Sequence, residues 1–410
     1  MDRVRVGWVG LGGRGYGLLG MVLDTMPDVD VVGVCDLYED RVERGRARVE
    51  EKRGVSPMAV TDYRRLLERD DIDAIITPSA WEAHVDVCID SMLAGKYVAT
   101  EVGGAYSINQ CWELVRTYER TRVPCMMLEN CCYGDREMTV LNLIKKGLFG
   151  EVIHCEGGYR HDLRDEVANG DINRHYRLRN YMNRCAEIYP THELGPIAKY
   201  LNINRGNRMI SLTSMASKSA GIQQWLANNR PEDPHAGFPF VQGDIVTTCI
   251  KCAHGQTIVL THDTSLPRAY SRGNLVQGTK GIWSEDKDGM LLEGMLDGPS
   301  YAHRFIPYAE FEKDHKHPLW RNYTAVGGHG GMDYLVMRGF IEAVKNQTQT
   351  PIDVYDTAAW MAITPLSEDS IACGSMPVAI PDFTNGKWTN REPYVRSKWC
   401  LEEVCEDMFE

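Results

Sequence analysis

The sequence lacks any long hydrophobic run and lacks a surplus of positive charge. No apolar stretch approaches the ~20 residues that a membrane-spanning helix needs. Lysine and arginine together number 45 against 57 aspartates and glutamates, which gives a formal net charge of -12. Such an excess of negative charge repels phosphate backbones and anionic lipid surfaces. We therefore predict that neither nucleic acids nor membranes are partners of this protein.

The N-terminus lacks an export signal. MDRVRVGWVG runs directly into a strand pattern, without the apolar segment and cleavage site of a signal peptide. We expect a cytoplasmic protein if the chain is complete, and a periplasmic or secreted one if an export signal has been trimmed.

Internal repeats and low-complexity linkers are absent as well. The 410 residues exceed the ~250–300 that one hydrophobic core usually serves. We predict two domains, 1–130 and 131–410, with the C-terminal tail packing back on the body.

Cysteine is plentiful, but its pattern argues against a disulfide framework. The thirteen residues are scattered and odd in number. Cys249, Cys252 and His254 are similar to half of a zinc site, yet no second ligand pair follows at zinc spacing. The segment is better explained as two strands around a His254-Gly255 turn. We predict no metal site.

A glycine-rich turn follows the first predicted strand, 4–9. Gly10, Gly12 and Gly15 fit the G-x-G-x-x-G spacing, and a helical stretch over 16–25 comes next. In this motif the glycines permit a tight turn, close approach to a pyrophosphate and close packing of helix on strand. The alternative is a glycine-rich loop in some other α/β fold.

The second strand ends in Asp36, 21 residues after Gly15. A carboxylate at this place accepts hydrogen bonds from an adenosine ribose and repels a 2′-phosphate. The spacing therefore favours NAD over NADP.

Strand and helix patterns alternate as far as residue 130, which predicts an α/β fold with a Rossmann doubly wound parallel sheet. Ligands of such sheets bind at the C-terminal ends of the strands. We expect the nicotinamide half of the cofactor near the residues that follow these strands: Thr77, Pro78, Trp81–His84, Glu101, Val102, Glu129 and Asn130.

The second half has a different pattern. Strand-like runs joined by turns lie between 203 and 290, and a helix is predicted from the glycines at 327–331 to about residue 346. We predict a C-terminal α+β domain with a large open, mainly antiparallel sheet. An open sheet face favours self-association, so we expect a homo-oligomer.

The polar motif YPTHELGPIAKYLNINRG begins at Tyr189. Pro190 and Thr191 restrict the backbone between Tyr189 and His192, and both side chains could point into one cleft. We expect Pro196 in the first turn of a helix that continues to residue 201. A structural role stays open for each residue, since a histidine is often a satisfied core residue and a tyrosine a half-buried packing residue.

These motifs resemble the Gfo/Idh/MocA oxidoreductases. The lysine of that family's E-K-P motif is replaced here, where TEVGG stands, and its G-x-H-x-x-D motif is altered to PTHELG. Both changes are similar to a branch of the same superfamily, glycoside hydrolase family 109, the NAD-dependent α-N-acetylgalactosaminidases. The similar blocks are GLGGRG, WEAH, TEV, LENCCYG, EGGYRHDLR, YPTHELGPIAKYLNINRG, LPRAYSRGNLVQGTKG and GGHGGMDY.

The resemblance implies a set of site residues. The residues that would contact NAD include those of the glycine turn. They are Gly10, Gly12, Gly13, Arg14, Gly15, Asp36, Trp81, Glu82, His84, Glu101, Val102, Asn130 and His192. Those that would line a sugar site are Tyr159, Arg177, Tyr189, Pro190, Thr191, His192 and Tyr270.

It also implies a glycosidase mechanism with tightly bound, recycled NAD+. Carbon 3 of the sugar is oxidised, the acidified carbon 2 proton is removed, the group on carbon 1 leaves, water adds and NADH returns the hydride. No flanking carboxylate pair is needed. We assign the catalytic roles to Tyr159, Tyr189 and His192: Tyr159 or His192 moves the protons, while Tyr189 and Tyr270 hold sugar hydroxyls.

Two other functions remain open at this stage. A sugar oxidoreductase that exchanges its NAD with an external pool would accumulate NADH in step with product. A non-catalytic NAD-binding module would tolerate the loss of His192 and Tyr159.

Overall fold

A computed structural model describes residues 1–294 and 303–409. The chain forms two compact units. Unit 1 comprises 1–134, 318–359 and 392–410, and unit 2 comprises 135–317 and 360–391. These spans differ from the predicted domains because two later segments of the chain belong to the first unit. The physical reason lies in the packing of helix α14, described below.

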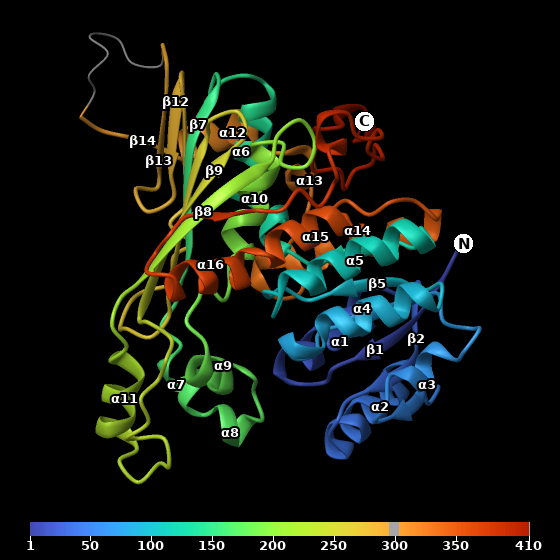
Figure 1. Ribbon diagram of the computed structural model, residues 1–410. Coiled ribbons are helices and arrows are strands. Elements are labelled where there is room, and N and C mark those ends of the chain that lie inside the picture. The colour runs from blue at the N-terminus through green and yellow to red at the C-terminus, as the bar shows by residue number, and fades with distance from the viewer. Residues whose placement is uncertain (295–302, 410) are drawn as a thin grey trace. The chain divides into compact units, whose positions relative to one another are not determined.

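Unit 1 contains a six-stranded parallel sheet (Figure 1). Its strands are β1 (Val4–Val9), β2 (Val29–Cys35), β3 (Met58–Val60), β4 (Ala74–Thr77), β5 (Tyr97–Thr100) and β6 (Cys125–Met127). Their order is β3-β2-β1-β4-β5-β6, so the chain reverses its direction of growth between β1 and β4. Such a switch point is the place where doubly wound sheets bind ligands. The predicted Rossmann sheet is confirmed.

The helices of unit 1 fall into two groups by their contacts. Helix α1 contacts α2 and α14, whereas α4 contacts α3 and α5, as expected if the groups cover opposite faces of the sheet. The bounds are α1 (Gly13–Thr25), α2 (Glu39–Arg53), α3 (Arg64–Leu67), α4 (Trp81–Leu93), α5 (Ile108–Thr121), η1 (Asn130–Tyr133), α13 (Pro318–Arg321), η2 (His329–Gly331), α14 (Met332–Asn346), α15 (Val354–Met361) and η4 (Glu406–Met408).

Helix α14 explains why a late segment joins unit 1. Its buried face carries Val336, Phe340 and Val344 at helical spacing, and the helix contacts β1, α1 and η1. Burying such a face is the main source of stability for a helix of this length. The tail is attached as well, because the Tyr133 hydroxyl donates to the carbonyl oxygen of Trp399 at 2.8 Å.

Unit 2 contains a nine-stranded sheet in the order β14-β13-β12-β11-β7-β10-β9-β8-β15. Only β7 and β10 pair in parallel; the other neighbours are antiparallel, which confirms the predicted mainly antiparallel sheet. The bounds are β7 (Val152–Arg160), β8 (Met209–Ala216), β9 (Ile245–Cys252), β10 (Thr257–Asp263), β11 (Leu275–Gly278), β12 (Gly281–Ser284), β13 (Gly289–Leu292), β14 (Ile306–Pro307) and β15 (Val378–Ala379).

Figure 1 shows the long strands β8 and β9 side by side. Along β9 buried residues alternate with exposed ones, so one face of the sheet is covered and the other is open. Self-association through the open face remains a prediction. The β9–β10 hairpin predicted around His254 is confirmed, and Cys249 is exposed while Cys252 is buried.

The covered face of this sheet carries helices of unit 2. Helix α10 contacts β7 and α6, α16 contacts β8, and α12 contacts α6. The bounds are α6 (Asp135–Lys145), α7 (Arg164–Ala168), α8 (Gly170–Asn173), α9 (Arg177–Asn183), α10 (Thr191–Tyr200), α11 (Gly221–Asn229), α12 (Ala309–His315), α16 (Ile363–Ala372) and η3 (Lys387–Thr389).

The predicted position of Pro196 in a first helical turn is wrong. Helix α10 begins at Thr191, so Pro196 lies inside it. Proline has no N–H, and it therefore cannot donate to the carbonyl of His192, four residues earlier. The helix tolerates this break because it is buried along its whole length and held by tertiary packing.

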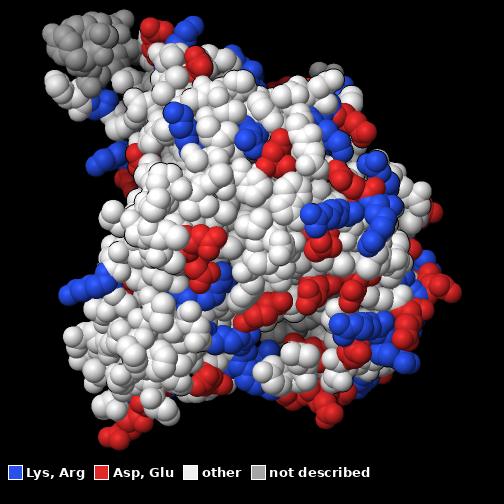
Figure 2. All heavy atoms as spheres, viewed as in Figure 1, with Lys and Arg blue, Asp and Glu red and all other residues white. Residues whose placement is uncertain are grey.

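Two surface properties can be compared with the expected partners. In the part of the chain that the structure describes, no helix is long and apolar enough to cross a bilayer. On the face drawn in Figure 2, lysines and arginines are interspersed with aspartates and glutamates.

Candidate functional site

The glycine turn of unit 1 has the geometry of a dinucleotide-binding loop. Gly10 has a φ of 110°, which an L side chain rarely adopts, and follows β1 directly. A Cβ on Gly15 would lie 2.2 Å from the carbonyl oxygen of Gly10, so only glycine lets α1 pack this closely on the strand. Helix α1 starts at Gly13 without a side-chain cap, and its first N–H groups are oriented to bind a phosphate.

Asp36 is fixed at the end of β2 by backbone donors. Its Oδ2 accepts from the N–H of Leu11 at 2.7 Å, and its Oδ1 accepts from the N–H of Tyr38 at 3.1 Å. Arg41 Nη1 lies 4.0 Å from Oδ1. A carboxylate oxygen can accept more than one hydrogen bond, so both remain able to bind ribose hydroxyls.

Arg14 lies between two carboxylates of unit 1. Its guanidinium donates to Glu101 Oε1 at 2.9 and 3.1 Å and to both oxygens of Asp333 at 2.6 and 2.9 Å. The paired, planar contacts with Asp333 are the strong form of an arginine–carboxylate interaction. They join the glycine turn to the first turn of α14.

Asp333 organises this group. It is 2% exposed and accepts from Asn130 Nδ2 at 2.8 Å, and His329 Nδ1 lies 2.9 Å from its Oδ2. Burial alone would raise its pKa, but the hydrogen bonds with His329 and Arg14 hold the pKa of Asp333 well below its usual range. A fixed negative charge therefore lies behind Arg14 at the C-terminal edge of the sheet.

The other residues that the sequence assigned to cofactor binding lie after β4 and β5. Trp81 and Glu82 begin α4, and Val102 follows Glu101 in a buried loop. His84 is buried, and its Nε2 lies 3.1 Å from the carbonyl oxygen of Ser79. Burial lowers the pKa of His84 to about 4, so the imidazole is neutral and Nε2 is the donor.

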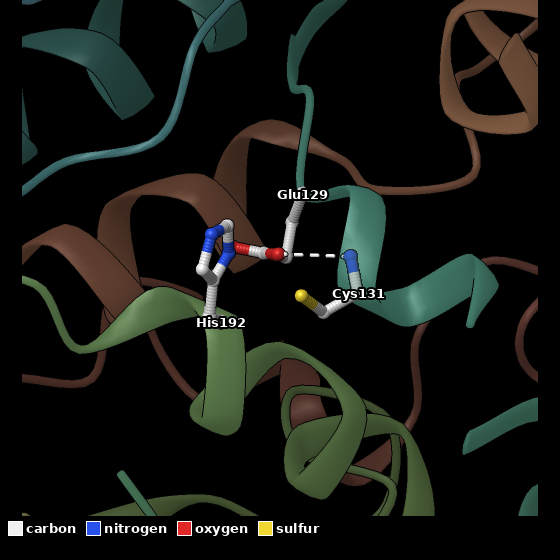
Figure 3. Close-up of side chains that lie close together, drawn as sticks. All are labelled: Glu129, Cys131 and His192. Carbon is white, nitrogen blue, oxygen red and sulfur yellow. Dashed lines mark hydrogen bonds between the residues drawn. The ribbon is translucent and has the colours of Figure 1, made fainter. Parts of the chain in front are cut away.

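Glu129 caps the start of η1, the short helix that follows β6. Figure 3 shows its carboxylate accepting from the N–H of Cys131 in η1, at 3.0 Å. Asn130, which the sequence assigned to the cofactor, lies between them. The same figure draws His192 on the first turn of α10.

In unit 2 the structure brings together Tyr159, Tyr189 and His192. The two tyrosine rings lie 4.3 Å apart, and the His192 ring lies 4.9 Å from Tyr189 and 5.6 Å from Tyr159. The Tyr189 hydroxyl lies 3.4 Å from His192 Nε2. Tyr159 ends β7, while Pro190 caps α10 and so places His192 in its first turn. We call these three residues the tyrosine–histidine cluster.

Arg177 lies over this cluster. Its Cζ is 5.0 Å from the ring centre of Tyr189 and 5.7 Å from that of Tyr159, and its Nε is 2.8 Å from Glu166 Oε1. The side chain is buried at the start of α9. A buried guanidinium stabilises negative charge that develops nearby, including charge on a phenol oxygen.

Tyr270 is 49% exposed and lies in the loop after β10. The ring of His161 contacts both Tyr270 and Tyr159. The rings of His161 and Tyr270 are 5.1 Å apart, and the Tyr159 hydroxyl is 3.4 Å from His161 Nδ1. The second unit therefore holds two tyrosine–histidine pairs, Tyr159 with His161 and Tyr189 with His192.

Buried titratable groups flank the cluster. Glu187 comes two residues before Tyr189; its N–H donates to Ser367 Oγ at 2.8 Å, and burial raises the pKa of its carboxyl to about 8. His262 is paired with Tyr159 in the β7–β10 register, and burial lowers its pKa to about 3. Both groups are therefore neutral near pH 7.

Sequence reasoning assigned no role to Asp333, His329 or His161. The first two lie in the block GGHGGMDY, whose similarity was noted without a function for its charged residues. His161 lies two residues after Tyr159, and residues two apart on a strand share a face. That spacing was a usable signal.

Comparison with known families gives two matches along the chain. Residues 133–390 match the model of the glycosyl hydrolase 109 C-terminal domain. Residues 4–129 match the oxidoreductase family model with an NAD-binding Rossmann fold.

Relatives and solved structures agree with these matches. An α-N-acetylgalactosaminidase of Tannerella forsythia is 39% identical over 95% of this chain and 88% of its own, and a glycosyl hydrolase family 109 protein of Solibacter usitatus is 38% identical over 95% and 90%. Myo-inositol dehydrogenase from Lactobacillus casei, solved with NAD(H) and myo-inositol, has the same fold (TM-score 0.63, 15% identity, 95% of this chain and 100% of that one). The chain belongs to glycosyl hydrolase family 109.

Proposed function

We propose that this protein is an NAD-dependent glycosidase that cleaves α-N-acetylgalactosaminides or closely related hexosides by transient oxidation of the sugar. The observation that carries the proposal is the tyrosine–histidine cluster beneath Arg177 in a chain that also has a dinucleotide-binding unit. This set offers proton-transfer groups and a buried cation, and it needs no flanking carboxylate pair.

The residues of unit 1 fit NAD. The glycine turn and the uncapped start of α1 would hold the pyrophosphate, and Asp36 would accept from the adenosine ribose. Arg14, fixed by Asp333 and Glu101, would lie beside the phosphates. When bound, NAD+ would supply reversible oxidation of the carbon 3 hydroxyl of the sugar, and we propose that it is retained and recycled.

The residues of unit 2 would handle the protons. A ketone at carbon 3 acidifies the hydrogen on carbon 2, so a modest base suffices to remove it. We assign this base to Tyr159, whose phenol oxygen becomes negative under Arg177. His192, paired with Tyr189, would exchange the proton of the carbon 3 hydroxyl. Tyr270 and Thr191 would contact sugar hydroxyls.

The name of the Tannerella relative supports the class of sugar. That enzyme is described as an α-N-acetylgalactosaminidase, and the similarity extends over 95% of this chain. The tyrosines and Arg177 match such a substrate, since sugar rings bind to aromatic faces and polar donors together.

The test is a panel of aryl α- and β-glycosides incubated with the purified protein without added cofactor. Release of the phenol and absorbance of reduced nicotinamide are recorded together. We expect phenol release from an α-N-acetylgalactosaminide with no net accumulation of NADH. In deuterium oxide, the carbon 2 hydrogen of the product should be replaced by deuterium.

Two results would contradict the proposal. NADH that accumulates in step with an oxidised sugar would indicate a dehydrogenase instead. Phenol release without incorporation of deuterium at carbon 2 would exclude the elimination step.

A further inference from the structure

His161 is a histidine outside the tyrosine–histidine cluster that nevertheless contacts it. It directly follows β7, and its backbone N–H donates to the carbonyl oxygen of Asp263 at 2.9 Å, which fixes its position at the strand end. Its Nδ1 lies 3.4 Å from the hydroxyl of Tyr159, and the two rings meet edge to face at 5.9 Å.

A tyrosine base needs a place for its own proton. A phenol carries its own proton, so Tyr159 can remove a proton from carbon 2 only after it has lost one. His161 Nδ1 lies 3.4 Å from its hydroxyl and is placed to receive this proton. A separation of 3.4 Å is long for a hydrogen bond, but catalytic contacts commonly shorten when substrate binds.

We propose that His161 is a positioning residue for Tyr159 that accepts the phenol proton and so makes Tyr159 a base. The inference rests on the proposed function and assigns a role to a residue outside the predicted site.

The proton balance is simple. The phenol proton moves from Tyr159 to His161 Nδ1, leaving a phenolate and an imidazolium. The phenolate then takes the hydrogen from carbon 2, which leaves the electron pair on the sugar as an enolate. Tyr159 is again a phenol, and the imidazolium returns its proton when the steps reverse during water addition.

The surroundings of His161 favour a neutral imidazole at rest. Burial lowers its pKa, Arg177 lowers it further, and the carboxylates of Glu166 and Asp162 partly oppose this. The groups that face it are Tyr159 on β7, Glu166 on α7, Arg177 on α9, and Asp162 and Tyr270 in loops. A neutral imidazole can accept a proton, whereas an imidazolium cannot.

Two substitutions separate proton transfer from orientation. His161→Asn keeps an acceptor for the Tyr159 hydroxyl but cannot take up its proton, and His161→Ala removes both. We expect both variants to lose about a hundredfold in kcat at pH 7 with KM little changed. Above pH 7 the kcat of the Asn variant should rise with pH, because Tyr159 must then ionise on its own, while the wild-type profile stays flat.

His254→Asn is the matched control. His254 lies in the exposed β9–β10 turn, where its Nε2 is 2.7 Å from the carbonyl oxygen of Gly206. Its loss should leave kcat and the pH profile unchanged. If His161→Asn retains the wild-type kcat and pH dependence, His161 orients Tyr159 without accepting its proton, and the proposal is wrong.

A second measurement does not depend on turnover. In the purified protein the His161 imidazole is titrated by NMR, in wild type and in Tyr159→Phe. A phenol that donates to neutral Nδ1 lowers the imidazole pKa, so Tyr159→Phe should raise it; an unchanged pKa would refute the coupling. If wild type fails to cleave any glycoside yet shows this shift, the proposed function fails and the pair itself stands.

Discussion

Arg14 Nη1 lies 2.6 Å from Asp333 Oδ2, which joins two residues 319 positions apart in the chain. Arg14 belongs to the first turn of α1, between Gly13 and Gly15. Its positive charge is therefore held beside the phosphate-binding turn by a carboxylate from α14. The second carboxylate, Glu101, comes from the loop after β5, so two segments other than α1 fix one guanidinium.

Replacing Asp333 should weaken NAD binding. Asp333→Asn keeps the shape of the side chain but removes one of the two carboxylate charges that hold Arg14, while the contacts of the guanidinium with Glu101 and His329 remain. Loss of a charge-assisted hydrogen bond costs about 1–2 kcal/mol at a partly exposed site, which corresponds to roughly five- to thirtyfold in Kd. Isothermal titration of cofactor-free protein with NAD measures the change.

Asp28→Asn provides the matched control. Asp28 lies in the same unit and pairs with Arg338 and Lys345 of α14, away from the glycine turn. It should lower the melting temperature as Asp333→Asn does, without affecting the Kd for NAD. Equal losses of affinity in both variants would show that stability, not the position of Arg14, governs binding.

Asp36 should determine the preference for NAD over NADP. In Asp36→Ser the carboxylate that repels a 2′-phosphate is gone, and Arg41, whose Nη1 lies 4.0 Å from it, can contact the phosphate instead. We expect the ratio of the two Kd values to shift toward NADP by at least about tenfold, or 1.4 kcal/mol. An unchanged ratio would mean that the ribose is not bound at Asp36.

Tyr159→Phe should remove the base while keeping the ring stack with Tyr189. We expect kcat to fall by about 10²–10⁴-fold, the usual contribution of a general base, with KM little changed. Tyr200→Phe is the control, because Tyr200 ends α10 and its hydroxyl donates to the carbonyl oxygen of Glu137 on α6. Incorporation of deuterium at carbon 2 should be lost in Tyr159→Phe alone.

Glu187 should make stability depend on pH. Its pKa is about 8 in the folded chain against a usual value of 4.5, so the folded state holds a proton that the unfolded state has released between these values. Unfolding free energy then falls as pH rises through this window, by at most about 1.4 kcal/mol per pH unit. Glu187→Gln should flatten the decline.

Chemical denaturation of wild type and Glu187→Gln at about pH 5, 7 and 9 measures the unfolding free energy. The cofactor is removed first, because bound ligand would itself stabilise the folded state. A Glu187→Gln variant with the same decline as wild type would show that other groups cause it.

Much of the fold follows from local patterns in the sequence. Strand 4–9, the glycine turn and the helix ending at Thr25 are set by a short apolar run and by glycine spacing, and the β9–β10 hairpin by alternation around a turn. The membership of α14 in unit 1 was not predicted, because it depends on which surface covers Phe340, and no local pattern encodes that choice.

Individual residues of the site could be predicted from the sequence. Tyr159, Tyr189 and His192 were chosen from one motif and one resemblance, and the structure brings their rings within 4.3 to 5.6 Å. Their catalytic roles stay predictions. Asp333 was missed because its contact with Arg14 is set by tertiary packing, whereas the spacing of His161 from Tyr159 was a signal that was not used.

The division of unit 1 among three segments has a consequence for biosynthesis. A ribosome that has completed residue 134 has made all six strands of the parallel sheet, but neither Asp333 nor the tail that receives the Tyr133 hydroxyl. In the nascent chain Arg14 can pair with Glu101, but its second carboxylate partner follows only after 199 further residues of translation (333 less 134). The Arg14–Asp333 ion pair can therefore form only late in synthesis, after most of the other unit has emerged.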